Sequence, residues 1–212
     1  MWGMTTRVNR RGAVRREALI DAAIELWATT GWRGTGITVV AERAGITPSG
    51  LLHHFGTKEA FLLEVIARLD HHEIERYKER GPAPGLDLFR RLPDMVRNYR
   101  DSPELWKLHH TLQAENLDPD SPAFDYYVAR HAYLRDEWVD AIRVGQDSGE
   151  IRPDADPDLV AVQVLAFLQG MVLHTIHGPD DVDLLEACLD YANRMIRDLA
   201  TDPHHADRPN ST

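Results

Sequence analysis

The sequence predicts an all-α fold of about nine helices, in which an N-terminal three-helix helix-turn-helix domain precedes a larger C-terminal helical domain. Apolar residues recur at the three- and four-residue spacing of an amphipathic helix along most of the chain. Proline and glycine gather between these segments, where helices begin and end. One stretch, residues 35–58, carries the pattern of two short helices joined by a tight glycine turn.

The first helix is expected over residues 14–30, and Gly31 would end it. Its apolar stripe has helical spacing and consists of Ile20, Ala23, Ile24 and Trp27. Residues 1–13 are expected to form a flexible basic arm in front of this helix. The arginines of the arm could reach phosphates or a minor groove, or the arm could be a solvated tail that only adds charge.

Residues 35–58 predict the helix-turn-helix itself. Gly45 suits the left-handed cap that would stop the first of its helices. Thr47 then offers an N-cap hydroxyl, and Pro48 takes the first helical position, where its missing N–H costs nothing. The two helices have apolar sides made by Ile37, Val40, Ala41 and Ala44, and by Leu51, Leu52 and Phe55. The second helix of such a motif enters the major groove of DNA.

A fourth helix is expected over residues 58–79, and the sequence GPAPG at 81–85 would break it. We therefore expect a helix-turn-helix domain over 14–60 and a helical domain over 61–200. The helical domain should contain five further helices, over residues 86–99, 103–116, 122–147, 157–177 and 181–200. Residues 201–212 are expected to be a disordered tail.

Pro93 lies inside the expected 86–99 helix. An interior proline removes a hydrogen bond and costs about 3 kcal/mol, so it should kink the helix, and a kink could open a cavity. The alternative is that a helix begins near Pro93.

The charge of the chain is divided unevenly. The net charge is −10, yet residues 1–60 hold eight Lys/Arg and five acidic residues, whereas 61–212 hold 16 and 29. This asymmetry predicts a nucleic-acid-binding end and a separate acidic body. The acidic body would repel the phosphate backbone and help to orient the basic end.

The residues of the motif have the chemistry that DNA recognition needs. Helix N-termini near residues 35–36, 47 and 57 would offer N–H groups to phosphates. Ser49 can hydrogen-bond a base edge, Pro48 can contact a thymine methyl group, and Gly50 lets the backbone approach closely. Lys58 supplies a point charge for a phosphate.

Many positions at fixed spacing together resemble the N-terminal domain of TetR-family transcriptional regulators, in detail over residues 14–74. They are residues 16–23 (REALIDAA), Gly31, Thr35, Ile37, Val40-Ala41, Ala44-Gly45-Ile46-Thr47, His54-Phe55 and Lys58-Glu59. The turn at 149–154 also resembles the segment that precedes the dimer helices in such regulators. The resemblance implies DNA contacts by Thr38, Thr47, Pro48, Ser49, Gly50, His53, His54 and Lys58. Leu52 departs from the pattern, which commonly has a phosphate-binding tyrosine there.

The resemblance also implies a small-molecule pocket in the body. Such pockets are mostly apolar and aromatic, with a few polar groups. The candidates on the predicted helices are Tyr99, Trp106, His109, Gln113, Tyr127, His131, Trp138 and Phe167. Each could instead be an ordinary core residue. The sequence does not identify the ligand.

The last two helices, 157–177 and 181–200, carry apolar residues over more than one face. Two such hairpins related by a two-fold axis would make a four-helix bundle, so these helices predict a homodimer interface. A wider intramolecular core is the alternative, and the resemblance favours the dimer.

Other classes of protein are disfavoured by what the sequence lacks. We expect no metal site, because adjacent histidines on a helix point about 100° apart and no second ligand set completes a zinc site. No catalytic constellation or cofactor motif occurs, so an enzyme is not expected. No apolar run approaches the ~20 residues of a membrane span. The first residues, MWGMTTRVNRR, carry charge but no hydrophobic signal region, so secretion is not expected. The single cysteine, Cys188, suits the cytoplasm.

These observations together predict a dimeric, sequence-specific, ligand-responsive DNA-binding regulator. Repression is the commoner role in the resembling family, and a small molecule would release the protein from a near-palindromic operator. The alternative is a DNA-binding regulator without a small-molecule inducer, controlled by a protein partner or by its abundance.

Overall fold

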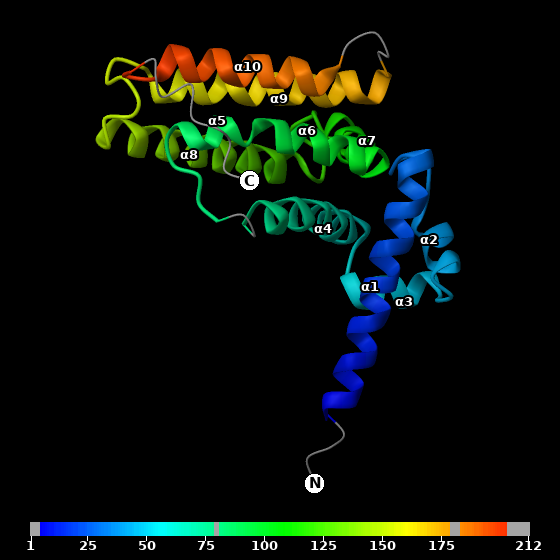
Figure 1. Ribbon diagram of the computed structural model, residues 1–212. Helices are drawn as coiled ribbons and strands as arrows, with labels where there is room; N and C mark the ends of the chain where they lie inside the picture. Colours follow the sequence, from blue (N-terminus) through cyan, green and yellow to red (C-terminus); the bar gives the residue numbers. More distant parts are fainter. Residues whose placement is uncertain (1–4, 79–80, 179–182, 203–212) are drawn as a thin grey trace. The chain divides into compact units, whose positions relative to one another are not determined.

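The computed structural model describes residues 5–78, 81–178 and 183–202, and this part of the chain is built from helices (Figure 1). The helices are α1 (Thr5–Thr30), α2 (Ile37–Arg43), α3 (Pro48–Phe55), α4 (Lys58–Lys78), α5 (Leu86–Arg90), α6 (Leu92–Asp101), α7 (Pro103–Ala114), α8 (Phe124–Asp147), α9 (Pro157–His177) and α10 (Leu184–Leu199). The only strand-like pairing in these ranges is an isolated antiparallel bridge between Ile151 and Ala200. The expected all-α class is confirmed.

The chain divides into two compact units. The first unit comprises residues 1–79 and 104–128, and the second comprises residues 80–103 and 129–212. The first unit thus contains α4, α7 and the start of α8 in addition to the helix-turn-helix.

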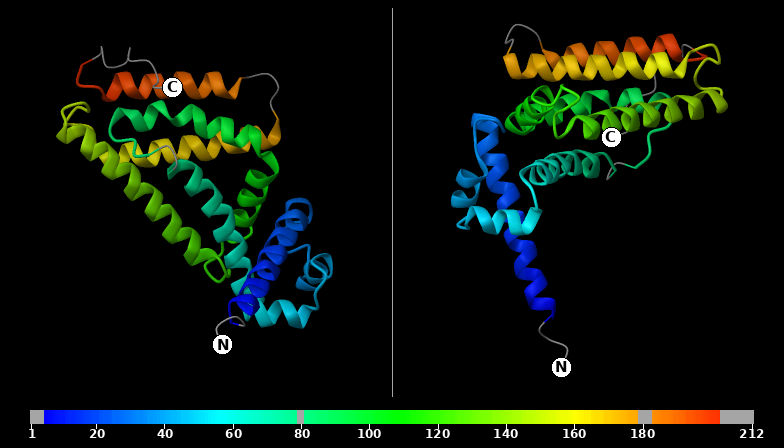
Figure 2. Two further views of the ribbon diagram at one scale, coloured as in Figure 1. Left: turned by 60° about the horizontal axis from the view of Figure 1, so that its bottom comes forward. Right: turned by 180° about the vertical axis from the view of Figure 1, so that it is seen from behind.

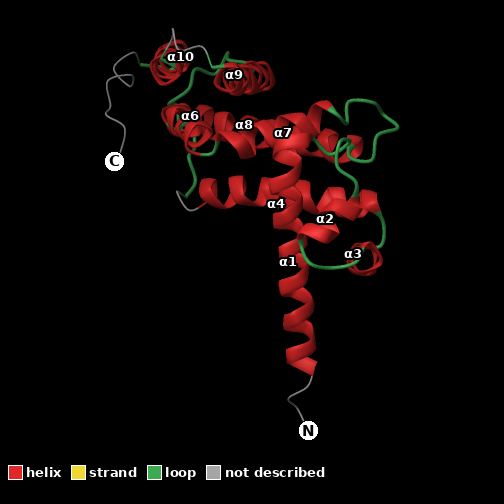
Figure 3. Cartoon of the chain, turned by 90° about the vertical axis from the view of Figure 1, so that its right-hand side faces the viewer, coloured by secondary structure: helices red, strands yellow, loops and turns green. Residues whose placement is uncertain are grey.

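The first unit is organised around an aromatic core. Phe61 of α4 is fully buried, and its ring centroid lies 5.6 Å from that of Trp27 and 4.6 Å from that of Phe55. Trp32 packs edge-on against Trp27 at 5.5 Å. Figure 3 shows α1, α2 and α3 grouped beside α4. Burying a side chain of this size stabilises the fold by about 1.5–3 kcal/mol. The aromatic core therefore holds α1, α3 and α4 together.

The start of α1 differs from the expectation. The helix begins at Thr5 and not near residue 14, so residues 5–13, expected as part of a flexible arm, are helical. This segment has no proline, and its arginines are good helix formers, whereas Gly12 alone costs about 1 kcal/mol. Residues 1–4 of the expected arm lie outside the described part of the chain.

The expected 86–99 helix is divided at Arg91 into α5 and α6. Pro93 occupies the first turn of α6, where proline fits without losing a hydrogen bond. The alternative stated for Pro93 therefore holds, and the interior kink does not occur.

The second unit packs α10 against α5 and α6, and α9 against α6 and α10. The right-hand view of Figure 2 shows α9 and α10 running side by side. Both helices begin at aspartate caps: the Asp156 carboxylate accepts hydrogen bonds from the first turn of α9, and Asp183 does the same for α10. The expected start of the last helix at 181 is therefore later, at Leu184, and residues 181–182 lie outside the described ranges.

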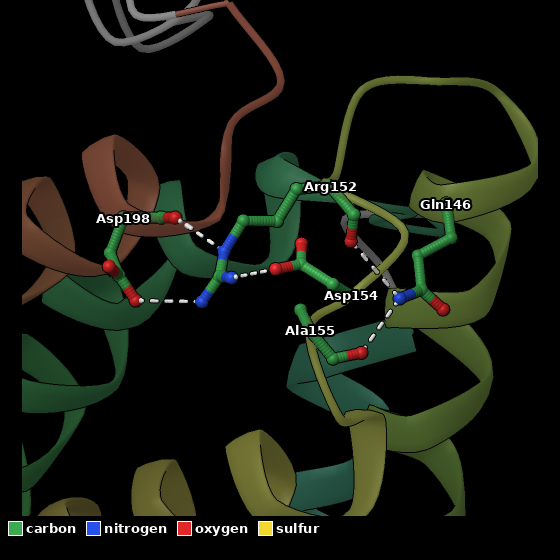
Figure 4. Close-up of polar contacts among 5 residues, drawn as sticks. All are labelled: Gln146, Arg152, Asp154, Ala155 and Asp198. Carbon is green, nitrogen blue, oxygen red and sulfur yellow. Dashed lines mark hydrogen bonds and ion pairs between the residues drawn. The ribbon is translucent and has the colours of Figure 1, made fainter.

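The turn after α8 connects three helix ends (Figure 4). The side-chain amide of Gln146 donates to the carbonyl oxygens of Arg152 (3.2 Å) and Ala155 (2.8 Å). Arg152 Nε donates to the Asp198 carbonyl oxygen (2.9 Å), and its Nη1 bonds the Asp154 carboxylate (2.9 Å). The turn therefore ties the ends of α8 and α10 to the start of α9.

A close backbone approach explains one glycine of this region. A Cβ at Gly145 would lie 2.6 Å from Ile151 Cδ1 and 2.8 Å from Gly85 Cα. No larger residue fits there without moving backbone. Beyond the turn, Thr201 N–H donates to the Glu150 carbonyl oxygen (3.0 Å), and residues 203–212 of the expected disordered tail lie outside the described chain.

Candidate nucleic-acid interface

The turn between α2 and α3 is a Schellman cap. The N–H of Gly45 donates to the Glu42 carbonyl oxygen (3.1 Å), and the N–H of Ile46 donates to that of Ala41 (2.9 Å). Gly45 has φ +71°, which favours glycine because a Cβ would be strained there. The turn fixes the direction in which α3 leaves α2.

The N-terminus of α3 is capped by its own first residues. Thr47 Oγ1 accepts a hydrogen bond from Gly50 N–H (3.1 Å) and lies 3.0 Å from Ser49 Oγ. Pro48 occupies the first helical position. A Cβ at Gly50 would lie 3.2 Å from Thr47 Oγ1, so the cap leaves little room for a side chain at that position.

The two faces of α3 differ in chemistry. Leu51 and Phe55 are buried in the core of the first unit. Ser49, Leu52 and His53 are exposed, whereas Pro48, Gly50 and His54 are half-buried. This helix thus presents a hydroxyl, an imidazole and one leucine on its accessible side.

Arg16 of α1 holds the C-terminal end of α3. Its Nη1 donates to the His54 carbonyl oxygen (3.0 Å), its Nη2 pairs with Glu64, and its guanidinium lies 4.4 Å from the Phe55 ring centroid. A cation at a helix C-terminus interacts favourably with the macrodipole. Arg16 therefore orients the helix, a role that the sequence pattern alone did not reveal.

The start of α4 is also capped. Thr57 Oγ1 accepts from Ala60 N–H (3.0 Å), and Gly56 ends α3 with φ +83°. Lys58 Nζ lies 4.1 Å from the Trp32 ring centroid, a cation–π contact. The predicted phosphate-binding lysine therefore has its ammonium held over an aromatic ring.

The start of α2 has no side-chain cap, because Gly36 takes the N-cap position. Thr35, predicted near this end, is buried, and its hydroxyl lies against that of Thr30. Thr38 is exposed on the first turn of α2. Of the eight predicted DNA-contact residues none is buried: Thr38, Thr47, Ser49 and His53 are exposed, and Pro48, Gly50, His54 and Lys58 are half-buried.

Four of the predicted ligand-binding residues lie in the first unit. They are Trp106, His109, Gln113 and Tyr127, on α7 and the start of α8. The His109 ring is buried, and its centroid lies 6.0 Å from that of Trp106 and 6.1 Å from that of Tyr127. The structure therefore brings these three rings together.

A buried carboxylate joins this group, and the sequence reasoning missed it. Asp70 of α4 is only 3% exposed; its Oδ1 lies 2.9 Å from His109 Nε2, and its Oδ2 accepts a hydrogen bond from Tyr126 OH (2.5 Å). Asp70 lies four residues after Ile66, so it is on the apolar side of its helix. This spacing could have predicted from the sequence that Asp70 is buried. We call Asp70, His109 and Tyr126 the Asp70 cluster.

The other four predicted ligand-binding residues, Tyr99, His131, Trp138 and Phe167, lie in the second unit. Tyr99 and Trp138 are buried, and Trp138 packs edge-on against Phe89 at 5.5 Å. Phe167 stacks on Tyr191, with ring centroids 3.7 Å apart. Tyr99 and Trp138 therefore belong to the packed core of this unit, whereas His131, Phe167 and Tyr191 are half-buried.

One cysteine lies in the same unit. Burial raises the pKa of the Cys188 thiol to about 11, although the charge of Arg97 opposes the shift. Burial also raises the pKa of Tyr191, with a smaller contribution from Cys188. Within residues 5–78, 81–178 and 183–202, no group of three His, Cys, Asp or Glu side chains could hold a metal ion.

The sequence matches two known families of regulators. Residues 19–65 match the bacterial regulatory proteins of the tetR family, and residues 108–200 match the C-terminal domain of BetI-type transcriptional repressors. The chain is also similar to the HTH-type transcriptional repressor KstR2 of Mycobacterium tuberculosis (strain CDC 1551 / Oshkosh). The two are 31% identical over 152 residues, which cover 69% of this chain and 74% of that repressor.

Solved structures have the same fold. A TetR-family transcriptional regulator from Rhodococcus sp. is 25% identical, with a TM-score of 0.67 over 85% of this chain and 96% of that one. SmeT, the repressor of the Stenotrophomonas maltophilia multidrug efflux pump SmeDEF, is 21% identical, with a TM-score of 0.71 over 92% and 94% of the two chains.

Proposed function

Because the chain belongs to the TetR family of bacterial regulatory proteins, we propose that it is a homodimeric repressor, released from a near-palindromic operator by a small molecule. As a member of this family it is a DNA-binding transcriptional regulator and not an enzyme. We place its action in the cytoplasm, where its DNA target would lie. The observation that carries the proposal is the accessible polar side of a short helix fixed on a rigid core.

The proposed contacts follow from the surface of this helix. Ser49 and His53 would reach base edges in the major groove, because both are exposed on the side of α3 opposite Leu51. The backbone of α3 is already restrained by its cap, its core contacts and Arg16, so little order would have to be gained on binding. Thr38 and Lys58 would bind phosphates on either side.

The dimer part of the proposal is supported by the apolar surface of α9. Leu159, Val162 and Leu173 are exposed at helical spacing along one side of this helix, and Ala166 lies between them. Contrary to the expectation from the sequence, this helix is long and apolar enough to cross a membrane by length and composition, and 33% of that stretch is buried within the chain. A core helix of a soluble protein can have the same length and apolar composition. In the proposed dimer, a partner subunit would cover the exposed apolar side of α9.

Val162→Glu tests the dimer, because a charge at the centre of the stripe would be buried without a partner. We expect the wild type to be a dimer by sedimentation equilibrium, and Val162→Glu to dimerise at least tenfold more weakly. Val128→Glu is the matched control, because Val128 is equally exposed on α8 (53% for both). Equal dimerisation of Val162→Glu and wild type would argue against this interface.

The effector is proposed to be an apolar molecule with one hydrogen-bonding group, because Trp106, Tyr127 and His109 form an aromatic cluster with a polar member. Release of labelled operator DNA would be followed by anisotropy in the presence of such compounds. If one class of apolar compounds releases the protein from operator DNA, the proposed effector is supported. If no compound releases the DNA, the alternative is favoured, in which the protein is a DNA-binding regulator without a small-molecule inducer.

The first experiment is a salt-controlled titration of the protein against the intergenic DNA beside its own gene, followed by footprinting. Two-fold-symmetric protection is expected, with half-sites one helical turn or a multiple apart. Lys58→Ala should reduce the salt slope by about one unit, whereas Lys107→Ala, on exposed α7 surface, should not. Absence of binding at low salt would contradict the DNA-binding surface itself.

A further inference from the structure

Leu52 is an exposed apolar residue on an otherwise polar accessible surface. It is 37% exposed, although Leu51 beside it and Phe55 on the same helix are buried. Its neighbours on the accessible side, Ser49 and His53, carry a hydroxyl and an imidazole. Single exposed apolar side chains are common on protein surfaces, so what distinguishes Leu52 is its place on the side of α3 that is proposed to face DNA.

Leu52 shares one edge of α3 with Pro48. The two residues are four apart, so they lie one above the other along the helix. The opposite edge holds Gly50 and His54 at the same spacing, and the His54 backbone is bound by Arg16. The two edges of α3 therefore differ: one is apolar, and the other is backbone and imidazole.

The chemistry of this edge limits what it can contact in DNA. Leucine and proline side chains have no hydrogen-bond donor, so they cannot hold a phosphate as a tyrosine hydroxyl would. The apolar group that the major groove offers is the C5-methyl group of thymine. That methyl lies on the side of the groove near the backbone of its own strand, where the edge of a recognition helix passes.

We infer that Leu52, with Pro48 beside it, reads a pyrimidine C5-methyl group, supplied by a thymine at a defined position of each operator half-site. The inference rests on the proposed function, because it requires that α3 enter the major groove. It adds to that function a base preference read by burial of one methyl group. Ser49 and His53 would read neighbouring base edges by hydrogen bonds.

The experiment begins by selecting a preferred duplex for the full-length protein from random-sequence DNA. Each thymine of the selected site is then replaced by deoxyuridine, which lacks only the C5-methyl group. Binding is measured at one fixed salt concentration. Loss of a buried methyl group should weaken binding about fourfold at one half-site, and about 16-fold when both half-sites are changed.

The variant Leu52→Ala should bind the thymine and deoxyuridine duplexes with affinities within about 1.5-fold of each other. Leu117→Ala is the matched control, because Leu117 is a leucine 69% exposed in the loop before α8, and it should keep the full methyl sensitivity. Ser49→Ala should also keep it while binding more weakly to both duplexes. Circular dichroism would show that the variants remain folded.

A second experiment places the methyl group on a different base. A 5-methylcytosine in place of the critical thymine, paired with guanine, keeps the methyl but changes the other groove groups. Wild type should prefer 5-methylcytosine to cytosine at this position by about fourfold, and Leu52→Ala should not distinguish them.

The outcomes separate the inference from the function beneath it. If the wild type selects a sequence but every deoxyuridine substitution is silent, or if Leu52→Ala keeps the sensitivity, the methyl contact is overturned while DNA recognition stands. If the wild type selects no sequence, both the inference and the proposed DNA recognition fail.

Discussion

The helix-turn-helix and the Asp70 cluster lie in the same compact unit, and both contain side-chain hydrogen bonds. They differ in how far apart in the sequence the bonded residues lie. In the motif, Thr47 caps Gly50 three residues away, and Gly45 bonds Glu42. In the cluster, Asp70 joins partners 39 and 56 residues away. The comparison teaches that the turns of the recognition surface come from short-range caps, with Arg16 added from 38 residues away, whereas every contact of the buried polar group joins different helices.

The largest test asks whether the motif depends on long-range packing after all. Phe61→Ala removes a fully buried ring between Trp27 and Phe55, so the free energy of unfolding should fall by about 3–5 kcal/mol. Denaturant unfolding would measure this change. Leu117→Ala, at an exposed site, should change stability by less than about 0.5 kcal/mol. A small loss for Phe61→Ala would mean that the short-range caps alone hold the motif.

Tyr126→Phe tests how much the Asp70 cluster stabilises the protein. It removes the hydroxyl that donates to the Asp70 carboxylate, which is buried and would lose a hydrogen bond. The expected loss of unfolding free energy is about 1–3 kcal/mol, because a buried acceptor loses its hydrogen-bond donor. Tyr133→Phe, on the exposed surface of α8, is the control and should be neutral. Equal stability of Tyr126→Phe and Tyr133→Phe would show that the Tyr126 hydroxyl does not stabilise the protein.

Thr47→Ala tests the short-range construction directly. Loss of the hydroxyl that accepts from Gly50 N–H should lower the unfolding free energy by about 1 kcal/mol and weaken DNA binding. Thr38→Ala should weaken DNA binding with little change in stability, because Thr38 is exposed and does not cap α2. If Thr47→Ala were as stable as wild type, the cap would have no energetic role.

The smallest expected effect concerns the second unit at high pH. Since burial raises the pKa of Cys188 to about 11, the folded protein favours the neutral thiol. The stability that comes from keeping the Cys188 thiol neutral is therefore complete below about pH 9 and is lost as the pH rises through about 11. At pH 8 only ~0.1% of the thiol is ionised, so alkylation of native protein should be far slower than that of unfolded protein. Equal alkylation rates would contradict the buried thiol.

Sequence patterns located the motif to within a residue or two, because glycine, proline and cap hydroxyls act on their immediate neighbours. Thr47, Pro48 and Gly45 have the backbone roles that the sequence predicted. The same reasoning failed for the start of α1, since nothing in residues 5–13 stops a helix, and for the 86–99 segment, where two outcomes for Pro93 were open. The predicted contacts to DNA, ligand and partner remain predictions.

By itself the sequence determined the helical class, the family and the chemistry of the accessible side of α3, because each follows from local spacing and residue type. Only the tertiary structure decided that Arg16 binds the end of α3, that Lys58 lies over Trp32, and that Asp70 meets His109. These contacts join residues on different helices. Their formation depends on packing energies summed over the whole core, which no local pattern contains.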